Sequence, residues 1–174
     1  MYAEKRDGVM RARNYRAVKG APYTRREYIR GFPPPKITKF TMGDTKSKFA
    51  YQASLIAQEE AQIRHNALEA ARVASNRVLM NKLGTSYVLR IVPFPHTILR
   101  ENKMIFGAHA DRLQDGMRKA FGKPVGSAAR VKAGQPIIEV GVNENGIEAA
   151  KEALKRGQAK LPIPSRIIIE KVQD

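Results

Sequence analysis

The chain has no cysteine and no tryptophan, and only 7% of its 174 residues are aromatic. The absence of cysteine excludes disulfides, thiolate catalysis and the common zinc sites, and it fits a reducing compartment. No apolar run approaches the roughly 20 residues of a membrane-spanning helix, and the basic start is not followed by the apolar core of a signal peptide. We therefore expect a cytoplasmic protein that does not bind membranes.

Hydrophobic residues nevertheless make up 43% of the chain, which argues against disorder throughout. A chain of this length typically forms one domain, alone or with an extension, and buries about 70% of its unfolded surface. Because aromatic residues are scarce, the core should consist mainly of Ala, Val, Ile and Leu.

Acidic residues are also few: 16 Asp and Glu stand against 32 Lys and Arg, so the formal net charge is +16. The excess is uneven, since residues 1–48 carry +9, residues 49–84 carry +1, residues 85–133 carry +6 and residues 134–174 carry 0. If the charge served only solubility, the last quarter of the chain would not be expected to have a net charge of zero. The distribution therefore predicts that two segments contact a polyanion.

Residues 1–35 are predicted to form an extended basic arm that binds RNA. Arginines are interspersed with Tyr15, Tyr23 and Tyr28, and the three successive prolines of "GFPPPK" exclude a helix and favour polyproline II. Guanidinium groups bind phosphates while tyrosine rings stack on bases, although each tyrosine could equally fix the arm to its own domain. With few large aliphatic residues, this arm is expected to become ordered only on RNA.

A single α+β domain is expected over residues 36–174, with two main helices. The first is predicted over 54–83, with Gly84 ending it. Its apolar stripe consists of Ile56, Ile63, Ala67, Ala70, Ala74 and Val78. The second is predicted over 145–157, with a capping box between Asn145 and Glu148 and with Gly157 past its end.

Short apolar runs between the two helices and after the second one predict strands. They lie in residues 86–92, 97–100, 104–106, 136–142 and 166–172. Several of their connections have hairpin length, which favours a compact, mostly antiparallel sheet.

No catalytic constellation stands out. The stretch "GMRKAFGK" (116–123) resembles a phosphate-binding loop, but five residues instead of four separate its glycines, and Pro124 occupies the place of the Ser or Thr that would hold magnesium. His65, His96 and His109 lack partners at metal-ligand spacing, and His65 is expected to be a solvated or satisfied helical residue. We expect no enzyme, no cofactor, no bound metal and no small-molecule substrate.

The predicted RNA-binding residues are the cations of the arm and of the central segment, together with one tyrosine and one histidine. They are Arg11, Arg13, Tyr15, Arg16, Lys19, Arg25, Arg26, Arg30, Arg90, His96, Arg100, Lys103, Arg112, Arg118, Lys119, Lys123, Arg130 and Lys132. They are chosen for their charge density and their placement along the chain.

A mobile loop is expected near residues 101–111. The stretch "ENKMIFGAH" combines the cation Lys103 and a flexible Gly107 with mostly apolar neighbours, as in a loop that enters a narrow RNA cavity. The following "ADRLQDGMRKAF" favours an amphipathic helix packed on the core. Its apolar positions at helical spacing are Ala110, Leu113, Met117 and Phe121.

Four stretches resemble a known family: "ALEAARVASNRVLMNKLG", "LRIVPFPHTILRENKM", "AHADRLQDGMRKAFGKPVGSAARVKAGQPI" and "AKEALKRGQAKLPIPSRIIIE". Together they are similar to the universal large-subunit ribosomal protein family called L-sixteen in bacteria, L-ten-e in archaea and QM in eukaryotes. The resemblance covers nearly the whole chain. The segment "ADRLQDGMRKAFGKP" and the basic start favour the archaeal and eukaryotic branches, and the short carboxy-terminal end favours the archaeal one.

The resemblance implies a β-hammerhead-like domain seated on large-subunit ribosomal RNA, with other ribosomal proteins as further partners. It also implies neighbours at the aminoacyl-tRNA site and a loop that approaches the peptidyl-transferase centre, so that the protein helps to position transfer RNA during translation. It implies no catalysis. Two alternatives share the basic surface: a free-standing RNA-binding or RNA-modifying protein, and a binder of anionic membranes or partners.

Overall fold

The computed structural model describes residues 17–18, 20–104, 106–107, 112, 114 and 116–172. Within these residues the strands are β1 (Thr41–Gly43), β2 (Tyr51–Ala57), β3 (Ala61–Arg64), β4 (Val88–Ile91), β5 (Thr97–Glu101), β6 (Lys123–Val131), β7 (Pro136–Val142) and β8 (Ser165–Lys171). The α-helices are α1 (His65–Leu83) and α3 (Ile147–Gln158), and the 3-10 helices are η1 (Arg26–Tyr28), η2 (Gly116–Lys119) and η3 (Glu144–Gly146).

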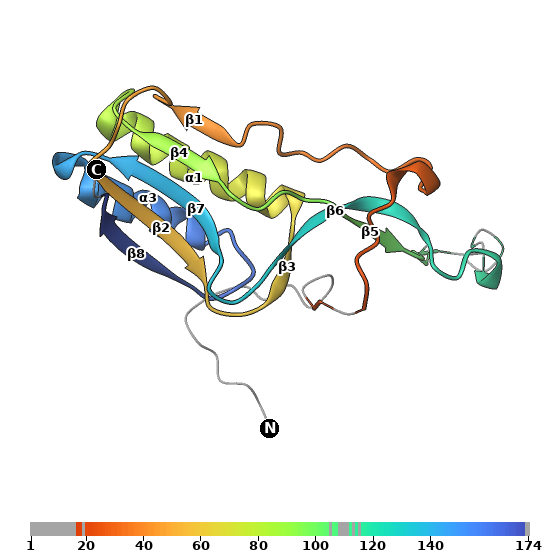
Figure 1. Cartoon of the computed structure of the whole chain (residues 1–174). Helices are drawn as coiled ribbons and strands as arrows, with labels where there is room; N and C mark the ends of the chain where they lie inside the picture. The colour runs from red at the N-terminus through yellow and green to blue at the C-terminus, as the bar shows by residue number, and fades with distance from the viewer. Residues whose placement is uncertain are drawn as a thin grey trace.

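The strands form two antiparallel sheets. The five-stranded sheet has the order β1-β4-β7-β2-β8, and the three-stranded sheet has the order β3-β6-β5. Every pairing between neighbouring strands is antiparallel. Figure 1 shows α1 and α3 behind the five-stranded sheet, while β5 and β6 extend away from the helices. The α+β class with a mostly antiparallel architecture is confirmed.

The two helices contact each other closely because small residues lie between them. Ser75 of α1 donates its hydroxyl hydrogen to the carbonyl oxygen of Ala153 in α3, at 3.0 Å. A Cβ at Gly157 would clash with the Ser75 hydroxyl and would lie 3.2 Å from a methyl carbon of Ile138. Gly157 is therefore a buried packing residue inside α3, and its predicted place past the helix end is wrong.

The predicted helix over 54–83 is wrong in its first third. Residues 51–57 form β2, residues 61–64 form β3, and α1 begins at His65. In β2 the side chains of Ala53, Leu55 and Ala57 are buried at every second position, which is the period of a strand. Because β2 pairs with both β7 and β8, hydrogen bonds between distant segments override the local helical pattern.

The buried face of α1 also differs from the predicted stripe. It consists of His65, Leu68, Ala71, Ser75 and Leu79. Ala67, Ala74 and Val78 are half-buried, and Ala70 is exposed. Since alanines occur on both faces of this helix, the apolar pattern alone did not distinguish them.

Four of the predicted strands are confirmed, and they correspond to β4, β5, β7 and β8. Met104 and Phe106 of the predicted strand 104–106 lie outside any strand, and Ile105 lies outside the described residues. The prediction missed β6, whose centre consists of small residues.

The predicted capping box at the start of the second helix is also wrong. Asn145 lies in η3, and Gly146 becomes the N-cap of α3 without any side-chain cap hydrogen bond.

Candidate nucleic-acid interface

A group of exposed and half-buried cations lies around the three-stranded sheet and the segments beside it. Figure 1 shows η1, β5, β6 and η2 together at the end of the molecule that lies away from α1 and α3. We call this region the basic end. The predicted RNA-binding cations that lie there are Arg25, Arg26, Arg30, Arg100, Lys103, Arg112, Arg118, Lys123 and Arg130. The structure thus brings together half of the predicted RNA-binding residues.

The described part of the arm lies against this sheet. The Gln62 side-chain amide donates to the carbonyl oxygen of Ala17, and the Arg130 guanidinium donates to that of Gly20, each at 2.9 Å. Gln62 and Arg130 are cross-strand neighbours in β3 and β6, so one site on the sheet holds both arm carbonyls. The boundary predicted after residue 35 stays a prediction, and these contacts show where the arm and the domain meet.

Arg100 links the arm to the base of the β5–β6 hairpin. Its guanidinium lies 4.0 Å from the ring centroid of Tyr23 and 5.2 Å from that of Phe121. The backbone N–H of Ile98 also donates to the carbonyl oxygen of Tyr23, at 2.8 Å. Tyr23 therefore fixes the arm to the domain, whereas Tyr28, with 74% of its surface exposed, is open to a binding partner.

The segment between β5 and β6 carries exposed apolar side chains. Met104 is 66% exposed, Phe106 is fully exposed, Met117 is 88% exposed and Phe121 is 78% exposed. The prediction that Met117 and Phe121 pack on the core is therefore wrong. Ala110 and Leu113 of the same predicted helix lie outside the described residues. Exposed apolar groups beside cations are typical of a surface that a partner covers.

Three predicted residues lie apart from the basic end. Arg90 is exposed on β4, where its cross-strand neighbours are Thr41 and Glu139. His96 is exposed beside Phe94, with 5.3 Å between their ring centroids. Lys132 lies in the turn between β6 and β7. Another group lies outside the described residues, or, for Lys119, has its side chain outside them: Arg11, Arg13, Tyr15, Arg16, Lys19 and Lys119.

A second cationic surface was missed. A groove of about 550 Å³ runs between α1 and α3, and Arg77, Lys82, Arg156 and Lys160 lie around it. Among the described residues that line the groove, Glu152 is the one acid, and it accepts hydrogen bonds from Lys82 at 2.6 Å and from Arg156 at 3.3 Å. Charge counts along the chain hide this surface, because α1 and α3 come from segments with net charges of +1 and 0. The sequence signal that could have predicted this surface is the set of cations in the last turns of both helices, Lys82, Lys155 and Arg156.

His65 connects the end of the arm to the sheet and to α1. The backbone N–H of Lys36 donates to Nδ1 of His65 at 2.9 Å, and a Cβ at Gly126 would lie 2.9 Å from Nε2. Burial lowers the pKa of His65, and the positive charges of Arg64 and Lys36 lower it further. The imidazole is therefore held neutral with its Nδ1 as an acceptor, which confirms that His65 is a satisfied helical residue.

We expect this histidine to make folding depend on pH. Because the pKa of His65 is lower in the folded chain than its usual 6.5, the unfolded chain binds more protons as the pH falls below that value, and stability is lost. Protonation of Nδ1 removes the hydrogen bond from Lys36, at a cost of about 1 kcal/mol. The urea midpoint should fall between pH 7.5 and 5.5, and less so in His65→Asn, which keeps an acceptor without titrating. Equal decreases in both proteins would contradict this role.

Among the described residues, no group of three or more His, Asp or Glu side chains could hold a metal ion. No helix in the described part of the chain is both long and apolar enough to cross a bilayer.

A sequence profile described as ribosomal protein L16p/L10e matches residues 18–168. The chain belongs to this family. It is 55% identical over 160 residues to the large ribosomal subunit protein uL16 of Staphylothermus marinus, covering 91% of this chain and 92% of that protein. It is also 55% identical over 156 residues to that of Hyperthermus butylicus (89% and 87% covered), and 49% identical over 164 residues to that of Methanococcus maripaludis (94% and 95% covered).

The family resemblance inferred from the sequence is therefore confirmed, and the three relatives come from archaea. Members of the L16p/L10e family are structural proteins of the large ribosomal subunit and are not enzymes, which confirms that this chain is not an enzyme. Its place is in the cytoplasmic ribosome, with ribosomal RNA and other ribosomal proteins as its partners.

Proposed function

We propose that the basic end binds large-subunit ribosomal RNA and that the protein helps to position transfer RNA near the aminoacyl site and the peptidyl-transferase centre. The observation that carries the RNA part is the group of nine predicted cations around the three-stranded sheet, while the face of α1 and α3 combines cations with Glu152 in ion pairs. The part concerning transfer RNA rests on the family resemblance.

The arginines of the basic end suit phosphate binding. Arg25, Arg26 and Arg30 are exposed, and each guanidinium presents a planar set of donors that matches a phosphate. Arg100 is held between two aromatic rings, so less side-chain freedom is lost when it binds. The arm cations from Arg11 to Lys19 remain part of the proposal, since they precede the segment that reaches the sheet.

The exposed apolar side chains between β5 and β6 suit binding to a confined RNA surface. Phe106 and Met104 supply faces on which bases or riboses can stack, and Lys103 supplies a charge for the backbone. The predicted mobility of residues 101–111 stays a prediction, since residues 105 and 108–111 lie outside the described residues.

Sedimentation with large ribosomal subunits tests the proposal. The protein should pellet with subunits through a high-salt cushion, whereas a free-standing RNA-modifying protein or a membrane binder should stay in the supernatant. The triple variant Arg25→Gln/Arg26→Gln/Arg118→Gln should pellet less. The matched control is Arg77→Gln/Arg156→Gln/Lys160→Gln, which removes the same charge from the groove between the helices. Equal losses in both variants would show that total charge, not the basic end, drives binding.

A further inference from the structure

Strand β8 is an edge strand with an open backbone. Within the described residues it pairs only with β2. The backbone N–H of Val172 donates to Ala50, and that of Gln58 donates to Pro164, so the even-numbered residues of β8 face β2. Because hydrogen-bonding direction alternates along an antiparallel strand, the N–H and C=O groups of the odd-numbered residues Ile167 and Ile169 point away from β2.

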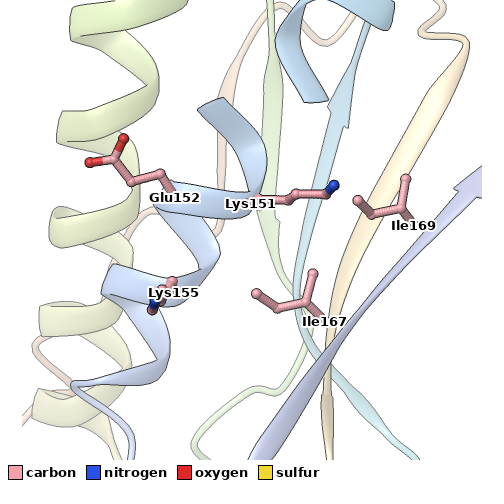
Figure 2. Close-up of a pocket in the computed structure, with 5 residues that line it drawn as sticks. All are labelled: Lys151, Glu152, Lys155, Ile167 and Ile169. Atoms are coloured by element: carbon pink, nitrogen blue, oxygen red, sulfur yellow. The ribbon is translucent and has the colours of Figure 1, made fainter. Parts of the chain in front are cut away.

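The side chains of the same two residues line a groove. Ile167 and Ile169 are half-buried and lie opposite Lys151, Glu152 and Lys155 of α3, around a groove of about 350 Å³. Figure 2 shows the Lys151 side chain extending from α3 toward Ile169, with both isoleucines on the β8 side of the gap. One short stretch of chain thus offers free backbone groups and an apolar surface together.

The charge of this groove is positive. Glu152 forms ion pairs with Lys82 and Arg156, whose nitrogens lie 2.6 and 3.3 Å from its carboxylate oxygens. The charge of Glu152 is therefore largely neutralised by Lys82 of α1 and Arg156 of α3. Lys151 and Lys155 remain exposed at the groove, so a carboxylate is the side-chain group that complements it.

We propose that an extended segment of a neighbouring large-subunit protein adds to β8 as a further strand. Residues opposite Ile167 and Ile169 would exchange backbone hydrogen bonds with them and would direct their side chains into the groove, because directly opposed residues share one face of a sheet. The segment carries aliphatic side chains for the isoleucines and carboxylates for Lys151 and Lys155.

A protein segment fits this site better than RNA does. Phosphates could contact the two lysines, but they would leave the isoleucine surface and the backbone N–H groups of β8 without partners. Three successive isoleucines, residues 167–169, lie on this edge between Arg166 and Glu170, with no charge or proline among them. Soluble proteins protect such edges against pairing, and covering by a partner is one means.

Photo-crosslinking in assembled large subunits tests the proposal. With benzoylphenylalanine at Lys155, the crosslink should join an extended segment of another protein that contains aliphatic residues and carboxylates. The matched control places the same probe at Lys160, in the groove between the helices. A crosslink to RNA, to a segment without carboxylates or to residues 1–16 of the same chain would overturn the proposal, and so would the absence of any crosslink.

Hydrogen exchange separates backbone pairing from simple contact. The amides of Ile167 and Ile169 should exchange freely in the isolated protein and at least about tenfold more slowly in the subunit, as expected for newly formed strand hydrogen bonds. The amides of Arg166 and Ile168, which face β2, should be protected in both states. Unchanged exchange at Ile167 and Ile169 would exclude strand addition.

Charge reversal tests the chosen chemistry. Lys151→Glu/Lys155→Glu should reduce the crosslink yield from a probe at Arg166 by about tenfold, because two attractive contacts become repulsive. Lys160→Glu is the control, and thermal unfolding of each isolated variant checks its fold. An unchanged yield would contradict an acidic partner. Incorporation of the variants into subunits is measured separately, so that loss of RNA binding is distinguished from loss of strand addition.

Discussion

Deletion of residues 103–109 should leave the fold and the incorporation into subunits nearly unchanged and reduce the translation rate of the assembled ribosomes by about 10- to 100-fold. Glu101 and Lys123 pair across β5 and β6, and a Cβ at Gly122 would clash with the backbone of Glu101, so the hairpin is closed before the deleted segment begins. Loss of residues 103–109 would thus remove the proposed contacts to RNA without removing core packing. The large effect is expected because small misplacements of reacting groups are costly.

Two measurements decide this prediction. Thermal unfolding of the isolated variant and its sedimentation with subunits should match the wild type, while single-turnover peptide-bond formation slows. Replacing residues 103–109 by Gly and Ser in equal number keeps the length of the loop and removes its chemistry. If that replacement restores translation, loop length and not Lys103 or Phe106 is responsible. An unfolded deletion variant would show that the segment belongs to the core.

Binding to a large-subunit ribosomal RNA fragment should depend steeply on salt. If about ten cations neutralise phosphates, the slope of log affinity against log salt is near −9, and affinity falls by about 10⁵ between 0.05 and 0.2 M salt. Titrations over this range measure the slope. A slope shallower than about −3 would contradict phosphate-dominated binding.

Charge-removal variants locate the contacts. Arg25→Gln/Arg26→Gln/Arg118→Gln should make the slope shallower by about 3, because each lost phosphate contact removes nearly one unit. Arg77→Gln/Arg156→Gln/Lys160→Gln changes the net charge equally and should leave the slope unchanged. If both variants lose the same slope, total charge and not the position of the cations at the basic end determines binding.

Several features of this protein followed from local sequence. The strand at 136–142 agrees with β7 at both ends, because an apolar run bounded by Gly134 and by Asn143 specifies a strand without reference to partners. The predicted strand 86–92 contains β4, and there the buried Tyr87, Leu89 and Ile91 alternate with the exposed Arg90. The uneven charge likewise indicated which segments form the basic end.

Other features were decided by contacts between distant residues. Residues 54–64 have enough Ala and Ile for a helix, but pairing of β2 with β7 and β8 and of β3 with β6 makes 54–57 and 61–64 parts of strands. Gly157 has the position of a helix end in the sequence, yet α3 continues to Gln158, and the glycine is required because a Cβ there would clash with the Ser75 hydroxyl. The groove between β8 and α3 brings Ile167 beside Lys151 in the same way.

One physical reason separates the features that local sequence predicted from those that contacts between distant residues decided. Charge, chain-breaking residues and the period of apolar side chains are properties of neighbouring residues, so the sequence alone established the α+β class, the basic surface and the family. The start of α1, the fixing of the arm by Tyr23 and the open edge of β8 depend on hydrogen bonds and packing between segments far apart in the chain. Only the tertiary structure decides these, because each partner's position is set by the fold as a whole.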